Sequence, residues 1–197
     1  SGLIVPIGLW VLQQACRDAL QWPGDITLAV NVSAVQIGSP SIVESILEAV
    51  RDTGMPPARV ELEITESAIS RDDQAARGVL QRLRGHGFQL AIDDFGTGYS
   101  SMAQLRELPF DTLKLDRSFV TGLGGERSSA SNAIISSLLH LSRSMGMSVI
   151  AEGVETRAEW KALQQLGCQY GQGYLFARPQ SQRLLLRSVH AGYLDHA

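Results

Sequence analysis

Short apolar segments rich in β-branched residues alternate with longer amphipathic segments along the chain, and this alternation constrains the fold most. Six short segments predict strands, and segments with apolar residues at three- and four-residue spacing lie between and around them. Such an alternation is typical of βα units, in which helices connect parallel strands. The predicted strands span residues 26–33, 60–66, 89–95, 112–116, 148–155 and 170–176.

Glycine, proline and serine mark the ends of the predicted helices. Pro23-Gly24 follows the first helix, Gly54 the second, and Pro109 closes a short helix that Ser100-Ser101 introduces. A segment of small polar residues, 121–131, predicts a loop. We expect helices over residues 5–22, 41–53, 73–85, 101–108, 132–145, 157–166 and 180–190.

Six βα units fit either a doubly wound open sheet or a (β/α)8 barrel that lacks two units. Polar residues late in the strands, or just after them, favour the barrel. In an open sheet only the strands beside the switch point supply the site, whereas here every strand offers a candidate. The α/β class is therefore predicted as a TIM-like (β/α)8 barrel with its first strands missing. The candidates are Asn31, Glu63, Asp93, Asp94, Lys114, Asp116, Glu152 and Gln172.

The composition excludes several classes of function. The chain has 197 residues, 44% of them hydrophobic and 19% charged, which predicts one globular domain over 1–197. A net charge of −3 without a basic stripe argues against a polymeric nucleic acid partner. No apolar run is long enough to span a bilayer, so this segment predicts no membrane contact. Cys16 and Cys168 lack metal-ligand spacing and are expected to be reduced thiols in a cytoplasmic protein.

Asp93 and Asp94 follow an apolar strand and precede a glycine-rich turn. Adjacent carboxylates raise each other's pKa, and a divalent cation relieves this repulsion. The alternative is that both residues cap the following turn, as Asp often does. Each polar strand end has such an alternative, and the alternative for Lys114 is an exposed ion pair with Asp116. Taken together, six ends directed to one mouth favour a shared site.

The predicted site is rich in oxygen ligands and contains one amine, Lys114. Oxygen ligands without His or Cys suit Mg²⁺ or Mn²⁺ rather than zinc. Two such ions can hold the attacking and leaving oxygens of a phosphoryl displacement, and Lys114 can position water or balance charge. An enolase-like lyase that uses Lys114 as base is the more remote alternative, and it would require a carboxylate-bearing substrate.

The same residues resemble the bacterial EAL domain family, the cyclic di-GMP phosphodiesterases. The similarity runs through the whole chain in order and at consistent spacing. The motifs are Asn31-Val32-Ser33, Glu63-Ile64-Thr65-Glu66-Ser67, 93–101 (Asp-Asp-Phe-Gly-Thr-Gly-Tyr-Ser-Ser), Leu113-Lys114-Leu115-Asp116, 151–156 (Ala-Glu-Gly-Val-Glu-Thr) and Gln172-Gly173-Tyr174-Leu175-Phe176.

The resemblance implies two Mg²⁺ or Mn²⁺ ions, inhibition by Ca²⁺, and hydrolysis of cyclic di-GMP to linear pGpG. It implies metal ligation by Asn31, Glu63, Asp93, Asp94 and Glu152, with Asp93 bridging the ions. Lys114 corresponds to the residue near the attacking water, and Gln172 and Asp116 to contacts on the substrate side. Glu66 corresponds to the anchor of the 94–101 loop. Strand alternation alone does not separate Glu61 from Glu63, since both point to the same face.

The chain departs from the family pattern at its start. The Glu-Ala-Leu signature is absent from the chain. The similar tripeptide Asp18-Ala19-Leu20 is not its equivalent, because it lies inside a predicted helix rather than at a strand end. We therefore expect a truncated or differently completed barrel with impaired activity, and one hypothesis is that a second chain seals it.

The resemblance also implies a homodimer and flanking sensory or GGDEF-type domains in a longer bacterial protein. It is compatible with anchoring of that protein to a membrane through other domains. A non-catalytic cyclic di-GMP receptor of the same family is the main alternative. Such a receptor would be expected to have lost the aspartate pair or Lys114, and the chain keeps both.

Overall fold

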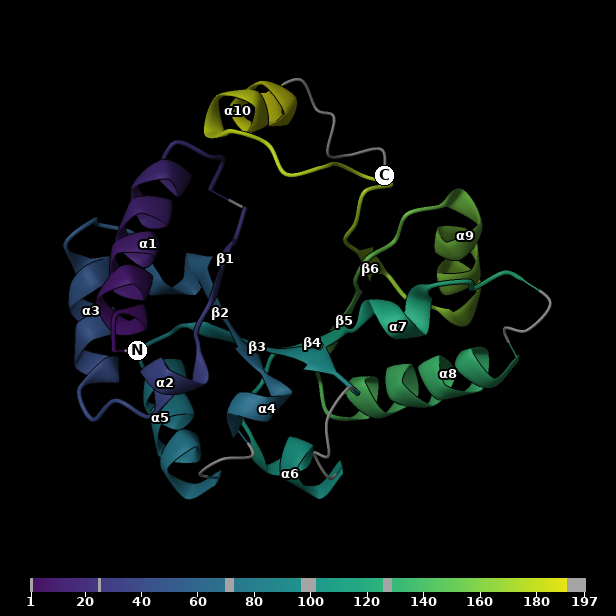
Figure 1. The fold of residues 1–197 in the computed structure, drawn as a ribbon, viewed down its shortest axis with the longest axis horizontal. Coiled ribbons are helices and arrows are strands. Elements are labelled where there is room, and N and C mark those ends of the chain that lie inside the picture. The colour runs from purple at the N-terminus through teal and green to yellow at the C-terminus, as the bar shows by residue number, and fades with distance from the viewer. Residues whose placement is uncertain (1, 25, 70–72, 97–101, 126–128, 191–197) are drawn as a thin grey trace. The chain divides into compact units, whose positions relative to one another are not determined.

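The computed structural model describes residues 2–24, 26–69, 73–96, 102–125 and 129–190 (Figure 1). The chain packs into two compact units. The first contains Ser1–Ile92 and Gly98–Phe110, and the second contains Asp93–Thr97 and Asp111–Ala197. The single domain predicted over 1–197 stays a prediction.

The first unit is built on two paired parallel strands. Asn31, the last residue of β1, lies opposite Glu63 in β2. Because the two strands are parallel, these polar residues lie side by side toward the carboxyl ends of their strands. Helix α1 packs against α3, α2 and β1, and α3 packs against α5. The elements are α1 (Ile4–Ala19), β1 (Leu28–Asn31), α2 (Ala34–Ile37), α3 (Ile42–Arg51), η1 (Pro57–Arg59), β2 (Val60–Thr65), α4 (Glu66–Ile69), α5 (Asp73–Gly85) and α6 (Met102–Glu107), with β3 (Gln89–Phe95) as far as Ile92.

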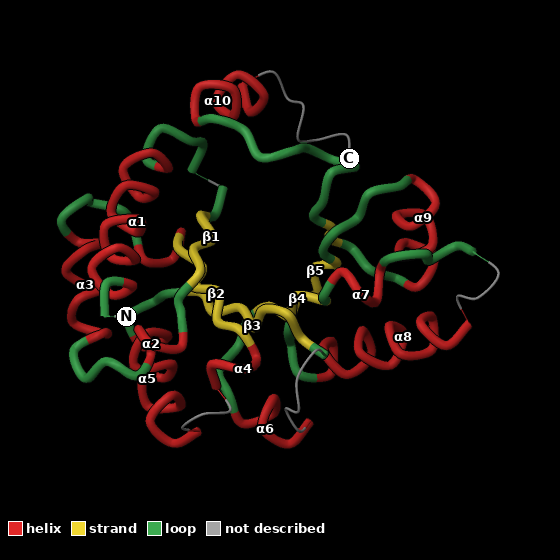
Figure 2. Tube along the Cα trace, viewed as in Figure 1, coloured by secondary structure: helices red, strands yellow, loops and turns green. Residues whose placement is uncertain are grey.

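The second unit contains three parallel strands with helices α7, α8 and α9 beside them (Figure 2). Lys114 in β4 lies opposite Ile150 in β5, and Ile150 in turn lies opposite Tyr170 in β6. Helix α8 packs against β5, α7 and α9. The elements are β4 (Thr112–Leu115), α7 (Arg117–Val120), α8 (Ser129–Ser144), β5 (Ser148–Ala151), α9 (Arg157–Leu166), β6 (Tyr170–Gly171) and α10 (Gln182–His190).

The strand order of the sheet follows the chain, β1-β2-β3-β4-β5-β6. A doubly wound sheet reverses its strand order at a switch point, and no reversal occurs among these strands. Consecutive parallel strands joined by helices are the pattern of barrel-type βα units. The α/β class predicted from the sequence is thus confirmed, and the sequential order favours the barrel type over the open sheet.

Three predicted strands are at least four residues shorter than expected, and the first of them, β1, spans Leu28–Asn31 rather than 26–33. Strand β5 ends at Ala151 rather than at 155, and β6 ends at Gly171 rather than at 176. Gly153 has a φ of +66°, which turns the chain away from the strand direction directly after Glu152. After β6 the chain enters a turn at 173–176. The polar residues Glu152 and Gln172 therefore follow their strands rather than lie within them.

Three short helices were not predicted, α2, α4 and α7. Four residues are too few to show helical periodicity, so only caps could have revealed them. Ser33 and Gln36 form a capping box at α2, and Asp116 caps α7. Helix α8 begins at Ser129, inside the predicted loop, while residues 126–128 of that loop and the Ser100-Ser101 cap lie outside the described part of the chain.

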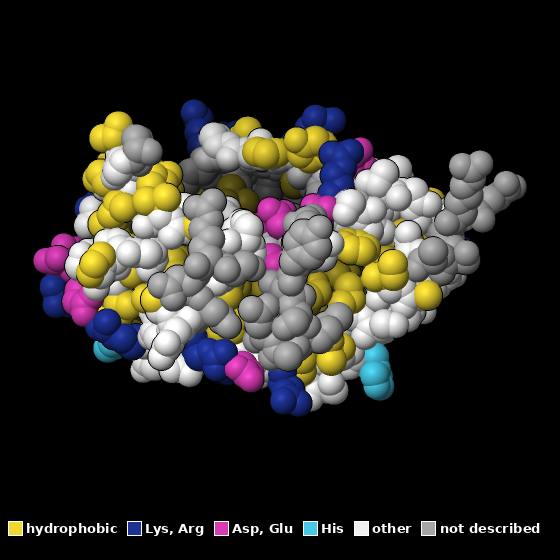
Figure 3. All heavy atoms as spheres, turned by 60° about the horizontal axis from the view of Figure 1, so that its bottom comes forward, with side chains coloured by type: hydrophobic (Ala, Val, Ile, Leu, Met, Phe, Trp, Pro, Cys, Tyr) yellow, Lys and Arg dark blue, Asp and Glu magenta, His cyan; other side chains and the backbone are white. Residues whose placement is uncertain are grey.

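Helix α1 carries apolar residues on two faces. Leu12, Cys16 and Ala19 are buried against the unit, whereas Ile7 and Trp10 are more than half exposed. Figure 3 shows hydrophobic side chains at the surface on the side of the molecule where α1 lies in Figure 1. The apolar periodicity of 5–22 predicted the helix but not which of its faces is covered. Among the described residues, no helix is long and apolar enough to cross a membrane.

Candidate functional site

The aspartate pair lies at the carboxyl end of β3. Asp93 exposes 9% of its surface, and its Oδ1 accepts a hydrogen bond of 2.9 Å from the backbone N–H of Asp94. Asp94 has a φ of +54°, a left-handed conformation that Asp tolerates better than most residues. The backbone therefore turns between the two residues, and the sequence contains no signal for this turn beyond the glycine that follows.

Lys114 lies in the neighbouring strand and is directed at two of the predicted ligands. Its side chain is only 3% exposed, and its Nζ lies 2.6 Å from Glu152 Oε1 and 3.7 Å from Asp93 Oδ1. The exposed pairing of Lys114 with Asp116 considered from the sequence is therefore not the arrangement found. A buried ammonium between carboxylates is a strong electrostatic interaction, because little water screens it.

Three carboxylates meet at this point. Asp93, Asp94 and Glu152 each offer an oxygen, and these oxygens lie within 4.8 Å of one another. Burial raises the pKa of Asp94, the negative charges of Asp93 and Asp116 raise it further, and Lys114 partly opposes the rise. One ammonium does not balance three carboxylates, so the cluster favours an additional cation. An all-oxygen donor set fits Mg²⁺, Mn²⁺ or Ca²⁺.

In the second unit, backbone hydrogen bonds between neighbouring strands continue just beyond the strand ends, and they position Glu152 and Gln172. The N–H of Glu152 donates to Leu115 O at 3.0 Å, and the N–H of Gln172 donates to Ala151 O at 2.8 Å. Glu152 and Gln172 also line one cavity of about 190 Å³, together with Arg117, Gly153, Glu155, Gly173 and Tyr174. The predicted ligand and the predicted substrate contact thus share a cavity.

Arg117 packs over the turn that follows Glu152. A Cβ atom at Gly153 would lie 2.6 Å from Arg117 Cγ, so both the positive φ and the close approach require glycine there. The guanidinium of Arg117 lies 3.0 Å from Glu155 Oε1. Sequence reasoning assigned no role to Arg117 or Glu155, because nothing local indicates that they meet.

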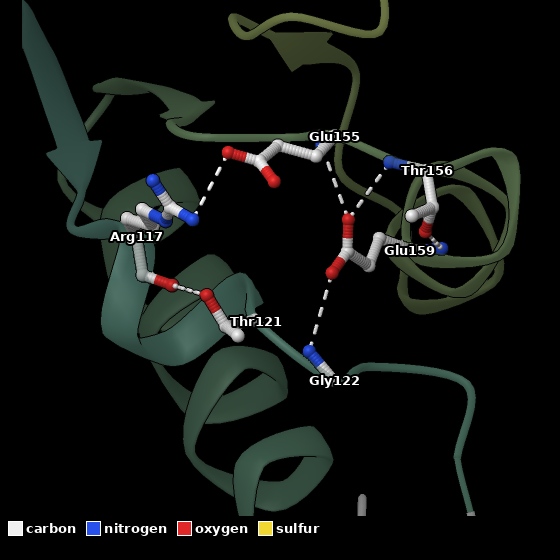
Figure 4. A network of polar contacts seen from close by, with 6 residues as sticks. All are labelled: Arg117, Thr121, Gly122, Glu155, Thr156 and Glu159. Atoms are coloured by element: carbon white, nitrogen blue, oxygen red, sulfur yellow. Dashed lines mark hydrogen bonds and ion pairs between the residues drawn. The ribbon is translucent and has the colours of Figure 1, made fainter.

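Glu159 joins the same region from the first turn of α9 (Figure 4). Its carboxylate accepts hydrogen bonds from the backbone N–H groups of Glu155, Thr156 and Gly122. Burial raises the pKa of Glu159, but these bonds outweigh it and lower the pKa overall. Sequence reasoning missed this residue, although the Thr-x-x-Glu spacing at 156–159 is the signature of a capping box.

Asp116 has a structural role in the second unit. Its Oδ1 accepts a hydrogen bond of 2.9 Å from the N–H of Ser118, which caps α7 and lowers the pKa of Asp116. The predicted contact between Asp116 and substrate stays a prediction.

Three further predicted site residues, Asn31, Glu63 and Glu66, belong to the first unit. Asn31 is exposed at the end of β1, while Glu63 and Glu66 are 6% and 2% exposed. Glu61 is 8% exposed, so burial does not separate it from Glu63 either. Residues 97–101 of the loop assigned to Glu66 lie outside the described residues. Their predicted roles as ligands and loop anchor stay predictions.

The model of the EAL domain family matches residues 1–179. The chain belongs to the EAL domain family. The resemblance noted in the sequence motifs is thereby confirmed.

The bifunctional diguanylate cyclase/cyclic di-GMP phosphodiesterase MucR of Pseudomonas aeruginosa is 42% identical over 193 residues, which cover 96% of this EAL chain and 28% of MucR. A solved structure of the PaMucR phosphodiesterase in complex with c-di-GMP is 41% identical with a TM-score of 0.88, covering 93% of this chain and 75% of that one. A manganese and cyclic di-GMP complex of Klebsiella pneumoniae BlrP1 is 34% identical with a TM-score of 0.82, covering 89% and 45%. The chain spans about a quarter of the length of the curated relatives it matches.

Proposed function

We propose that this EAL chain carries a metal-dependent phosphodiesterase site for cyclic di-GMP, with linear pGpG as product. One observation carries the proposal: the carboxylates of Asp93, Asp94 and Glu152 converge, and Lys114 contacts two of them from within the same unit. These are the residues that a phosphodiesterase needs, and a receptor without catalysis has no need to keep all of them.

The carboxylates and Lys114 have different proposed roles in the hydrolysis of the phosphodiester. A water oxygen bonds to phosphorus and loses a proton, while the bond from phosphorus to one ribose oxygen breaks and that oxygen takes up a proton to become a hydroxyl. Divalent ions, when bound, supply positive charge for the phosphate oxygens and lower the pKa of the attacking water. Asp93, Asp94 and Glu152 would hold those ions through their carboxylate oxygens. Lys114 keeps Glu152 and Asp93 oriented, and its charge opposes the negative charge that grows on the phosphate.

Other parts of the proposal rest on the sequence resemblance. Asn31 and Glu63 are proposed as further ligands, Glu66 as the loop anchor, and Gln172 and Asp116 as substrate contacts. The cavity shared by Glu152 and Gln172 supports the substrate contact of Gln172. Two Mg²⁺ or Mn²⁺ ions are proposed as cofactors, with Ca²⁺ as an inhibitor. Structures of BlrP1 in complex with cyclic di-GMP and either manganese or calcium support the proposal that divalent ions of this kind bind in the family.

The setting in the cell is also proposed. We expect a homodimer and flanking regulatory domains, including a GGDEF-type domain, in the bacterial cytoplasm. The name of MucR combines a cyclase and a phosphodiesterase activity in one longer protein, which supports the proposed domain partners.

The test is titration of the purified chain with cyclic di-GMP in Mn²⁺, Mg²⁺ or Ca²⁺, following binding and pGpG release together. We expect slow turnover in Mn²⁺ and Mg²⁺, in keeping with the impaired activity expected from the absent Glu-Ala-Leu signature, and none in Ca²⁺. Asp93→Asn and Glu152→Gln should abolish turnover, because each removes a carboxylate from the cluster. Glu48→Gln is the matched control, since the Glu48 side chain is 68% exposed and forms an ion pair of 4.0 Å with Arg51.

The outcomes separate the candidate functions. Binding of cyclic di-GMP with no pGpG in any metal would favour the receptor alternative. Absence of binding in every metal would contradict both functions for this chain.

A further inference from the structure

We propose that Glu159 is a positioning residue that holds Glu152 in place by tying the segment after β5 to the end of α7. The inference rests on the proposed function, because that function uses Glu152 as a ligand. Glu159 itself contacts no predicted ligand, and its carboxylate acts through backbone N–H groups.

The two carboxylate oxygens of Glu159 accept hydrogen bonds from different segments of the chain (Figure 4). Oε2 accepts from the N–H of Glu155 at 3.1 Å and of Thr156 at 2.9 Å, which caps the start of α9. Oε1 accepts from the N–H of Gly122 at 3.2 Å, 37 residues away in sequence and just beyond α7. Glu159 is 7% exposed, so little water competes for these bonds.

The segment between Glu152 and Thr156 is therefore fixed at its far end to α7. Its middle is fixed to the other end of the same helix, because Arg117 pairs with Glu155 at 3.0 Å and its stem occupies the space beside Gly153. Helix α7 starts directly after Asp116, which follows the strand that carries Lys114. The short helix α7 therefore links the two segments that carry Lys114 and Glu152.

A cap for α9 alone would not need the bond to Gly122. Replacing Glu159 by Gln separates the two roles, because Gln keeps one acceptor oxygen. The N–H groups of Glu155 and Thr156 both need an acceptor, so the amide oxygen of Gln is expected to face them. The amide NH₂ group then faces the N–H of Gly122, where it cannot accept a hydrogen bond. Thr156→Ala makes the opposite change: it removes the hydroxyl that accepts from Glu159 N–H and keeps the carboxylate tie.

The experiment compares the purified chain with Glu159→Gln and Thr156→Ala. Calorimetric titration with Mn²⁺ alone gives the metal affinity, and amide hydrogen exchange reports on Gly122 and Glu155. We expect Glu159→Gln to weaken Mn²⁺ binding by about 10-fold, the lower end of the range for groups that contact a metal ligand directly, because Glu159 acts on Glu152 only through the backbone. Exchange at Gly122 should accelerate in the same variant. Thr156→Ala should lower the melting temperature and keep the Mn²⁺ affinity within about twofold of the unchanged chain.

Three results would overturn the proposal: unchanged Mn²⁺ affinity in Glu159→Gln, unchanged exchange at Gly122 in that variant, or an equal loss of affinity in Thr156→Ala. Absence of Mn²⁺ binding by the unchanged chain would also overturn it, because Glu152 would then have no metal to hold. Mn²⁺ binding without pGpG release would instead contradict only the proposed function.

Discussion

Lys114 Nζ lies 2.6 Å from Glu152 Oε1, which brings together a strand residue and a residue just beyond the next strand. The ammonium is 3% exposed, and the nearest oxygen of Asp93 lies 3.7 Å away. Lys114 therefore serves two purposes: it offsets the carboxylates before any metal binds, and it fixes the side chain of Glu152 within the site.

Lys114→Met tests the first of these purposes. Removing the cation leaves neighbouring carboxylates without their counter-charge, so we expect a loss of about 3 kcal/mol in the free energy of unfolding without metal. Mn²⁺ should then stabilise the variant more than it stabilises the unchanged chain. Urea unfolding with and without Mn²⁺ measures both effects. Lys161→Met, an exposed change on α9, is the control and should stay within about 0.5 kcal/mol. Equal stabilisation by Mn²⁺ in both chains would contradict the expectation.

Asp94→Asn separates charge from backbone conformation. Asn tolerates a φ of +54° as Asp does, so the turn is kept while one negative charge is lost. Burial and the charge of Asp93 raise the pKa of Asp94, which means that its ionised form is disfavoured without metal. We expect higher stability without metal and Mn²⁺ affinity reduced at least about tenfold. Asp94→Ala is the comparison, since the left-handed backbone costs it about 1 kcal/mol more. Tighter Mn²⁺ binding in Asp94→Asn would refute the assignment of Asp94 as a ligand.

The pKa of Glu159 predicts a pH dependence. Because its pKa is lower in the folded chain than the ordinary value of 4.5, its stabilising contribution is fully present above about pH 4.5. That contribution is lost as the pH falls through the folded pKa. The difference in unfolding free energy between the unchanged chain and Glu159→Gln should therefore be largest near neutral pH and shrink below pH 4.5. Denaturant titrations across this range measure it, and a difference that grows on acidification would refute it.

The two cysteines should resist modification in the folded chain. Cys16 and Cys168 are 0% and 3% exposed, and burial raises the pKa of both thiols, although hydrogen bonds partly oppose this. Low thiolate content and poor access both slow alkylation. We expect slow reaction with iodoacetamide in buffer and fast reaction of both thiols in urea, counted by mass spectrometry. Rapid labelling of the native chain would show that these segments open readily.

Much of the candidate site was predictable from the sequence because its residues follow strand ends. Asp93, Asp94, Lys114, Glu152 and Gln172 come from segments whose apolar character marks them as strands, and parallel strands bring their carboxyl ends to one edge. The same reasoning did not choose between Glu61 and Glu63, which share a face and are both buried. It also extended β5 and β6 too far, since the apolar residues that follow Glu152 and Gln172, such as Val154 and Leu175, resemble a continuation of the strands.

The sequence by itself determined the α/β class, the order of the elements and the acidic character of the site, because periodicity and composition are local properties. Only the tertiary structure decided that Lys114 faces Glu152 rather than Asp116, and that Glu159 reaches Gly122. Such contacts join residues that are distant along the chain, and their geometry depends on where helix α7 packs. The left-handed turn at Asp94 belongs to the same group, since a conformation that is costly locally persists only where the surrounding packing holds it.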